Sequence, residues 1–182
     1  MNTLSLGTIA ITAALMISAC TPGPMGTKRY KPYTGSDAAV VYTQLNTTSS
    51  GLFYLERFSK EDDCYKSAER YYISNNFMTG DTTNHLIENR IQANQNWALY
   101  TTNNSSSHIF SSFTAFIPES GKRYVAIASE GVVEIPDDLK LSDSDNLAKV
   151  YEQYKGKQAK IWNVRNGRCK FWFAKLSDSL KF

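Results

Sequence analysis

A chain of 182 residues is long enough for one domain with a substantial core and too short for two ordinary domains. Its residues are 42% apolar and 20% charged, a balance that excludes a disordered chain. The formal net charge of +3 comes from 20 basic and 17 acidic residues scattered along the chain, so we expect no nucleic-acid partner.

The first 19 residues predict a leader that is removed from the mature protein. The strongest apolar stretch, Ile9 to Ile17, is shorter than the roughly 20 residues that cross a bilayer, and it is typical of a secretory signal peptide. Ile17-Ser18-Ala19-Cys20 resembles the lipobox of bacterial lipoproteins, which implies cleavage between Ala19 and Cys20 and lipid on the Cys20 thiol. No Lys or Arg precedes the apolar stretch, which departs from that pattern. The alternative is an ordinary signal peptide cut elsewhere.

By the same resemblance, Thr21 after the cysteine implies sorting to the outer membrane, because Asp at this place marks retention at the inner membrane. Residues 21–36 are rich in Pro and Gly and predict a flexible tether. We therefore expect a lipidated cysteine and tether at 20–36 and one folded domain at 37–182. Lys28, Arg29 and Lys31 form a tight basic group that either contacts anionic headgroups or belongs to a solvated tether.

Assigning Cys20 to lipid leaves two cysteines, Cys64 and Cys169, in an oxidising compartment. We expect a disulfide between them, which would stabilise the fold by up to roughly 4–5 kcal/mol because it closes a loop of about a hundred residues. A redox or metal pair is the alternative. C-x-x-C spacing is absent, however, and the only histidines are His85 and His108.

Short alternating runs rich in aromatic and β-branched residues predict strands. They occupy residues 38–45, 51–58, 85–94, 96–102, 109–118, 122–129, 159–164 and 169–176. The intervening polar turns predict three hairpins: 38–45 with 51–58, 109–118 with 122–129, and 159–164 with 169–176. The last has an Asn-Gly step typical of a type I′ turn. About seven or eight such strands indicate an antiparallel β-sandwich of immunoglobulin-like or transthyretin-like type.

Two segments carry helical signals. Residues 59–72 have Ser59 and Asp62 as a candidate cap, so a short helix competes with a strand there. Residues 142–157 are clearer, since Leu147, Val150, Tyr151 and Tyr154 share one face. Asp143 or Ser144 is the candidate cap and Gly156 the stop. We therefore predict one short helix inserted before the last hairpin.

Two motifs and a late cysteine carry a family resemblance. The matching positions are Pro32, Gly35, Ala38 and Val40 in the first motif, Phe116, Pro118, Gly121, Lys122 and Tyr124 in the second, and Cys169. Together with the lipobox, they resemble a diffuse group of small proteobacterial outer-membrane lipoproteins. Members are mostly described as having unknown function, so the resemblance implies location and fold and no catalytic residue. The helical segment 142–157 departs from it.

No catalytic set is predicted. G-x-S-x-G and Gly-rich phosphate loops are absent, and the 143–146 segment lacks the Gly and closing Glu of a calcium loop. We expect neither enzyme activity nor a cofactor or metal. Trp97, Trp162 and Trp172 form the candidate binding surface, unless Tyr151 and Tyr154 of the helix cover the aromatic residues of 169–176 as a second small core.

The predicted function is that of a non-enzymatic interaction or assembly module, anchored by its N-terminal lipid and facing the periplasm, with a protein partner in the cell envelope. The transthyretin-like lipoprotein of type VI secretion systems is an analogue at the level of fold alone. The alternative is a ligand-binding or inhibitor lipoprotein, with a cell-wall glycan or a lysozyme-type protein as its partner.

Overall fold

The computed structural model describes residues 28–44, 51–75, 85–104, 109–128 and 130–163, together with Cys169. Several predictions lie outside these residues: the lipobox, His108, Trp172, the turn at 165–168 and the strand at 169–176. The described strands are β1 (Lys28–Arg29), β2 (Ala38–Gln44), β3 (Gly51–Glu61), β4 (Cys64–Asn75), β5 (Leu86–Gln92), β6 (Asn96–Asn104), β7 (Ile109–Ile117), β8 (Arg123–Ile127), β9 (Gly131–Ile135) and β10 (Lys160–Ile161). Helix α2 (Leu147–Tyr154) lies between β9 and β10.

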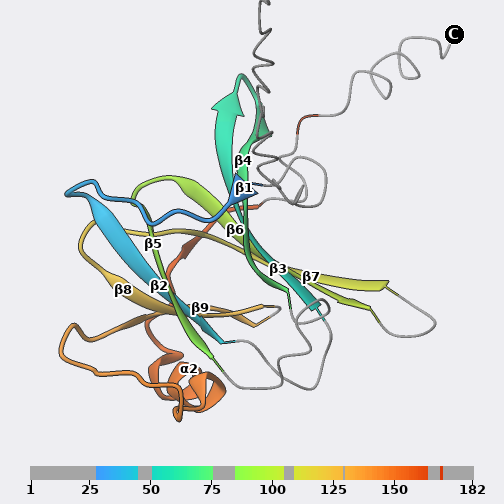
Figure 1. Ribbon diagram of the computed structural model, residues 1–182. Coiled ribbons are helices and arrows are strands. Elements are labelled where there is room, and N and C mark those ends of the chain that lie inside the picture. The colour runs from blue at the N-terminus through green and yellow to red at the C-terminus, as the bar shows by residue number, and fades with distance from the viewer. Residues whose placement is uncertain are drawn as a thin grey trace, which may run out of the picture.

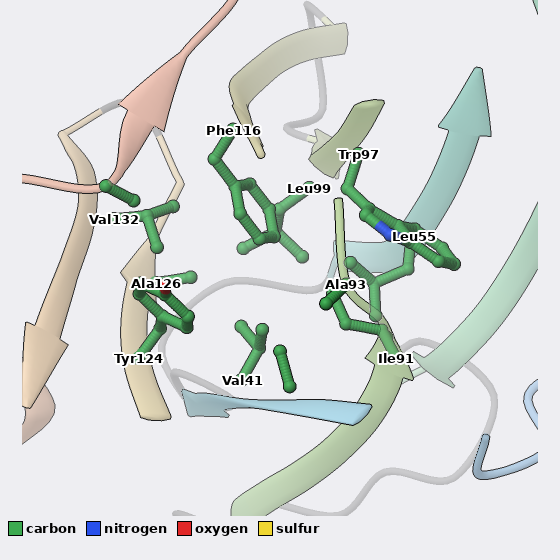
Figure 2. Packing of buried hydrophobic residues seen from close by; sticks show 12 residues of the cluster. Val41, Leu55, Ile91, Ala93, Trp97, Leu99, Phe116, Tyr124, Ala126 and Val132 are labelled. Atoms are coloured by element: carbon green, nitrogen blue, oxygen red, sulfur yellow. The ribbon is translucent and has the colours of Figure 1, made fainter. Parts of the chain in front are cut away.

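The strands form two sheets (Figure 1). One has the order β1-β4-β3-β6-β7-β10 and the other the order β5-β2-β8-β9. The core lies between them: Leu55, Leu99 and Phe116 from the first sheet meet Val41 and Tyr124 from the second (Figure 2). Each contributing strand alternates inward and outward side chains, as a two-sheet sandwich requires. The predicted sandwich is confirmed, and its eight strands of five residues or more agree with the number expected.

Helix α2 covers the outer face of the four-stranded sheet. Val125 and Val133 point away from the core and pack against Leu147 and Tyr151, which are almost fully buried. The face predicted from the sequence is therefore confirmed. Asn146, rather than Asp143 or Ser144, caps the helix, and its side chain accepts hydrogen bonds from the backbone N–H groups of the first turn.

Two of the predicted hairpins are wrong, because the chain crosses between the sheets where a hairpin was expected. β2 belongs to the four-stranded sheet and β3 to the six-stranded one, and β7 and β8 are divided in the same way. At the second crossing Pro118 has no N–H to continue β7. Gly121 then adopts a φ of +73°, which allows the chain to turn.

The two motifs of the lipoprotein resemblance lie side by side. β8 runs parallel to β2, with Val40 opposite Arg123 and Tyr42 opposite Val125. The Gly121 N–H donates to the Ala38 carbonyl at 3.0 Å, and the Val40 N–H donates to the Lys122 carbonyl at 3.0 Å. The motifs therefore build the centre of the four-stranded sheet. The sandwich is not wholly antiparallel, since β1 also pairs parallel to β4.

Two further local predictions change, and one strand was not expected. Residues 59–72 form strand, not helix: β3 and β4 make a long hairpin that turns at Asp62, whose φ is +51°. β9 was not predicted. Residues 28–36, assigned to the tether, instead lie against the domain, where the Tyr30 N–H donates to the Tyr72 carbonyl at 3.2 Å and the Tyr33 N–H to the Arg90 carbonyl at 2.9 Å.

Candidate functional site

One hollow opens between the two sheets beside α2, and we call it the inter-sheet cleft. Its volume is about 590 Å³. Its described lining consists of Thr43, Gln44, Phe53, Leu99, Thr101, Ala126, Ile127, Ala128, Glu130, Asp143, Ser144, Asp145, Asn146 and Ala148. The larger apolar side chains come from β3, β6 and β8, and most of the polar ones come from the end of β2 and from the segment that leads into α2. Amphipathic lining of this kind is typical of small-ligand and peptide sites.

Hydrogen bonds fix the polar rim of the inter-sheet cleft. The Gln44 amide donates to the Asp145 carbonyl at 2.7 Å and accepts from the Leu147 N–H at 3.2 Å. Asp143 accepts from the Leu86 N–H at 2.8 Å. These contacts tie β2 and β5 to the start of α2, so the 143–146 segment serves the helix start. Among the residues that the structure describes, no group of three or more His, Cys, Asp or Glu side chains could hold a metal ion.

A buried amide lies behind the cleft wall. Asn89 is fully buried, and its Nδ2 donates to Thr43 Oγ1 at 3.2 Å and to the Val41 carbonyl at 3.1 Å. Its Oδ1 has no hydrogen-bond partner. A buried acceptor without a partner costs about 1–3 kcal/mol. A water molecule or a ligand donor that reached past Thr43 would remove that cost.

The cleft carries an uneven charge. Glu130, Asp143 and Asp145 line it, and none of its described lining residues is basic. The Glu130 and Asp143 side chains are exposed. An acidic rim over an apolar wall is complementary to a ligand or partner surface that is both basic and apolar.

A second, smaller hollow lies at the other end of the sandwich, and we call it the basic cleft. Its volume is about 190 Å³. It is lined by Tyr30, Lys31, Pro32, Tyr33, Thr34, Arg57, Glu69, Tyr71, Arg90, Ile91, Gln92 and Trp97. The segment 30–34 forms one wall, since it crosses from β4 to β5. Tyr71 stacks on Trp97, with 6.3 Å between ring centroids, and forms the floor.

Glu69 neutralises one cation of the basic cleft. Its Oε2 accepts two hydrogen bonds from Arg57, both at 3.1 Å, and one from the Tyr71 hydroxyl at 2.8 Å. Lys28 approaches its Oε1 at 3.5 Å. The Tyr71 hydrogen bond, followed by those from Arg57, lowers the pKa of Glu69 below its usual value. Burial raises the pKa of Tyr71 to about 12, and the Glu69 carboxylate adds to that rise.

Two cations of the basic cleft remain without a carboxylate. Lys31 and Arg90 are exposed, and neither has an ion pair within the described ranges. Arg90 Nε donates to the Tyr33 carbonyl at 3.4 Å, which leaves the rest of its guanidinium facing solvent. The carboxylate on the same face of β5, Glu88, accepts a hydrogen bond from Tyr42 at 3.2 Å. No feature of the sequence predicted that Arg90 and Lys31 would line the same cleft.

The structure separates the predicted tryptophan surface. Trp97 is 3% exposed and lies in the core, so it is wrong as a surface residue. Trp162 lies on the opposite face of the same sheet, where its ring centroid is 5.0 Å from that of Phe58 and 4.8 Å from that of Tyr65. Its Nε1 donates to the Trp97 carbonyl at 2.9 Å. The two tryptophans are therefore joined through backbone but face different ways. Helix α2 covers the four-stranded sheet, whereas both tryptophans lie on the six-stranded sheet.

A buried ion pair on the outer face of the six-stranded sheet was not predicted. Glu56 is fully buried, and Arg70 Nη2 donates to both of its carboxylate oxygens, at 3.1 and 3.2 Å. Both residues occupy outward positions on paired strands, with Glu56 opposite Arg70. Alternation alone assigns such a Glu to solvent, so the sequence offered no signal for this burial.

The predicted disulfide between Cys64 and Cys169 is present, and it links residues 105 apart in the sequence. Cys64 begins β4 at the tip of the long hairpin, and the Cys169 N–H donates to the neighbouring Tyr65 carbonyl at 3.0 Å. His85 is exposed just before β5. No helix within the described part of the chain is long and apolar enough to cross a membrane.

No family model matches this sequence, and the searches of curated proteins and of solved structures found no match either.

Proposed function

We propose that this chain is a bacterial outer-membrane lipoprotein, anchored through lipid on Cys20, with its sandwich domain in the periplasm as a non-enzymatic interaction or assembly module. The observation that carries the proposal is the pairing of Cys64 with Cys169. It leaves Cys20, which ends the lipobox-like Ile17-Ser18-Ala19-Cys20, as the remaining one of the three cysteines in the sequence. Disulfides persist in oxidising compartments, which supports export.

The anchor is tested by metabolic labelling with a palmitate analogue in cells that produce the full chain. We expect label on the wild type and on Thr21→Ser, and none on Cys20→Ala. Globomycin, which blocks the lipoprotein signal peptidase, should cause a longer precursor to accumulate. A Cys20→Ala protein that still took up label, or an unchanged length under globomycin, would overturn the anchor.

The interaction role is supported by the inter-sheet cleft, which opens beside the start of α2. Helix α2 lies away from β1 (Figure 1). Crosslinking in intact cells should capture an envelope protein at this end of the domain. Glu130→Gln removes a rim charge whose carboxylate has no hydrogen bond or ion pair with the residues that the structure describes, and Glu152→Gln makes the same change on an exposed turn of α2. We expect the first variant to weaken capture and the second to leave it unchanged. Equal capture by both variants would count against the cleft.

The alternative, a ligand-binding or inhibitor lipoprotein, is favoured by the acidic rim and apolar wall of the same cleft. Lysozyme-type enzymes are basic proteins, whereas cell-wall glycans carry few apolar groups. Binding of the two partners should therefore differ in its dependence on salt and on the acidic rim. Titration of the purified full chain with lysozyme should show binding that weakens with salt and with Glu130→Gln. Binding of soluble peptidoglycan fragments that is insensitive to both would instead identify a glycan site elsewhere.

A further inference from the structure

The basic residues that follow the leader are fixed to the domain. β1 pairs with β4, and the segment 30–34 continues onto β5. The Tyr33 N–H donates to the Arg90 carbonyl at 2.9 Å, and Arg90 Nε donates to the Tyr33 carbonyl at 3.4 Å. The Tyr30 hydroxyl also donates to the Arg90 carbonyl at 2.7 Å. The backbone at Lys31 is therefore held in place beside Arg90, and both residues belong to the surface of the sandwich domain.

The charge on this surface is unbalanced. Three cations line the basic cleft, Lys31, Arg57 and Arg90, against one carboxylate, Glu69, so the net charge of the lining is 3 − 1 = +2. Arg57 is the cation that Glu69 neutralises, because Arg57 Nε and Nη2 both donate to that carboxylate. The remaining positive charge belongs to the exposed Lys31 and Arg90. Such a surface attracts phosphate-bearing headgroups.

Chain length places the basic cleft close to the anchor. Cys20 precedes Lys28 by eight residues, and an extended chain covers at most about 3.6 Å per residue, so the anchor lies within about 29 Å of β1. Helix α2 lies at the opposite end of the sandwich from β1 (Figure 1). The inter-sheet cleft is lined by residues at the start of that helix. A lipid on Cys20 would therefore hold the cationic end of the domain nearest the bilayer. This step rests on the proposed function.

We propose that the basic cleft docks on anionic phospholipid headgroups and orients the tethered domain. Lys31 and Arg90 contact the headgroup phosphates, and the inter-sheet cleft then faces away from the membrane toward a partner. Each cation near an anionic surface contributes about 1 kcal/mol, which is about a five-fold shift in population per cation. Two such contacts would bind a free domain only weakly. They suffice to choose an orientation, because the lipid already holds the domain at the surface.

Lysine footprinting on the lipidated full-length product tests the orientation without adding a cysteine. The protein is reconstituted into vesicles of phosphatidylglycerol and phosphatidylethanolamine, or of phosphatidylcholine alone, and the rate of lysine acetylation is read by mass spectrometry. We expect Lys31 to react several-fold more slowly in the anionic vesicles, and Lys149 on α2 to react at one rate in both. Salt at 0.5 M, on the order of a 4 Å screening length, should abolish the protection.

Two variants of equal charge change provide the control. Arg90→Glu should remove the protection of Lys31, whereas Lys155→Glu, which makes the same change on the exposed end of α2, should leave it. The protein is also acetylated in detergent with about 10 mM inorganic phosphate. If phosphate slowed the acetylation of Lys31 about as much as anionic vesicles do, the headgroup assignment would be overturned, because the site would then be one for free phosphate.

Failure of docking and failure of the anchor give different results. Equal acetylation of Lys31 in the two vesicle types, in samples where all the protein floats with the vesicles, overturns the docking and leaves the anchor in place. Protein that does not float, and whose N-terminal peptide carries no lipid mass, overturns the anchor and the docking together.

Discussion

Glu69 joins three neighbours that come from different parts of the chain, and its ionisation should be visible in stability. Hydrogen bonds from Tyr71 and Arg57 lower its pKa in the folded state. The unfolded chain has a Glu pKa of about 4.3. A lowered folded pKa contributes stability that is present above the unfolded value and is lost as pH falls through the folded one.

Glu69→Gln should therefore destabilise the protein at pH 7 by about 1–2 kcal/mol, because Arg57 loses its charged acceptor. The difference from wild type should shrink below about pH 4, where the wild-type carboxyl becomes protonated. Urea unfolding at pH 7 and pH 3 measures both. The control is Glu61→Gln, which alters an exposed pair with Lys66 at 3.3 Å and should change stability by less than about 0.5 kcal/mol. A pH-independent difference would contradict this account.

Gly131 is a second residue with a defined physical role. Its φ is +153°, and a Cβ at this position would lie 2.7 Å from the Tyr151 hydroxyl oxygen. Gly131→Ala should destabilise the fold by about 1–3 kcal/mol through backbone strain and the clash under α2. Adding Tyr151→Phe removes the clashing oxygen, so the two changes together should cost less than their sum in a thermal-unfolding cycle. Simple additivity would show that backbone strain alone sets the cost.

At the scale of elements, α2 depends on its buried face. Leu147 is fully buried beneath the helix start, against outward side chains of the four-stranded sheet. Leu147→Ala should therefore cost about 2–5 kcal/mol of unfolding free energy. Lys149→Ala, on the exposed face, should stay within about 0.5 kcal/mol. If the two substitutions changed the free energy of unfolding equally in chemical denaturation, α2 would not contribute to the stability of the global fold.

The disulfide stabilises the hairpin tip against the C-terminal region. Replacing Cys64 and Cys169 together by Ser opens a loop of 105 residues, and we expect a loss of about 2–5 kcal/mol. Reduction of the wild type with dithiothreitol should lower its midpoint of urea unfolding to that of the double variant. The double variant itself should not respond to the reductant. A reductant-sensitive double variant would assign the effect to something other than this bond.

Elements could be predicted from the sequence more reliably than their partners. The helix has a 3.6-residue pattern, and Leu147, Val150, Tyr151 and Tyr154 share the face that packs on the sheet. Turn signals, by contrast, are identical whether the next strand pairs with the last one or crosses to the other sheet. This is why 109–118 and 122–129 were predicted as a hairpin. β9 was missed because Val132 and Val133 are both buried, one in the core and one under α2, which removes the alternation.

The candidate sites followed the same division. The cysteine pair could be predicted because the expectation of a disulfide depended on the number of cysteines and on an oxidising compartment, and not on the geometry of the fold. The surface residues could not: Trp97 looks like a surface aromatic until β6 is placed against β2 and β8. Lys31 and Arg90 are 59 positions apart, and the hydrogen bonds between Tyr33 and Arg90 make them neighbours. Tertiary contacts between distant segments, rather than local pattern, determine both clefts.

At the scale of the whole molecule, the two clefts give the sandwich two chemically different ends. One presents Lys31 and Arg90, and the other presents Glu130 and Asp143. The rigid sheets between them keep these ends apart, so a contact at one end determines which way the other end faces. If the chain is anchored as proposed, the same polarity allows a partner to approach without competing with the bilayer.

The parallel pairing of β2 with β8 also has a consequence in time. β2 is held on one edge by residues 86–92 and on the other by residues 123–125. A chain delivered N-terminus first therefore presents β2 long before either neighbour has arrived. One edge of β2 stays open until residue 92 has emerged, and the other until residue 125 has emerged. Folds built on such distant pairings assemble slowly, on the order of milliseconds to seconds. Folding of this domain must follow, rather than accompany, the delivery of most of its length.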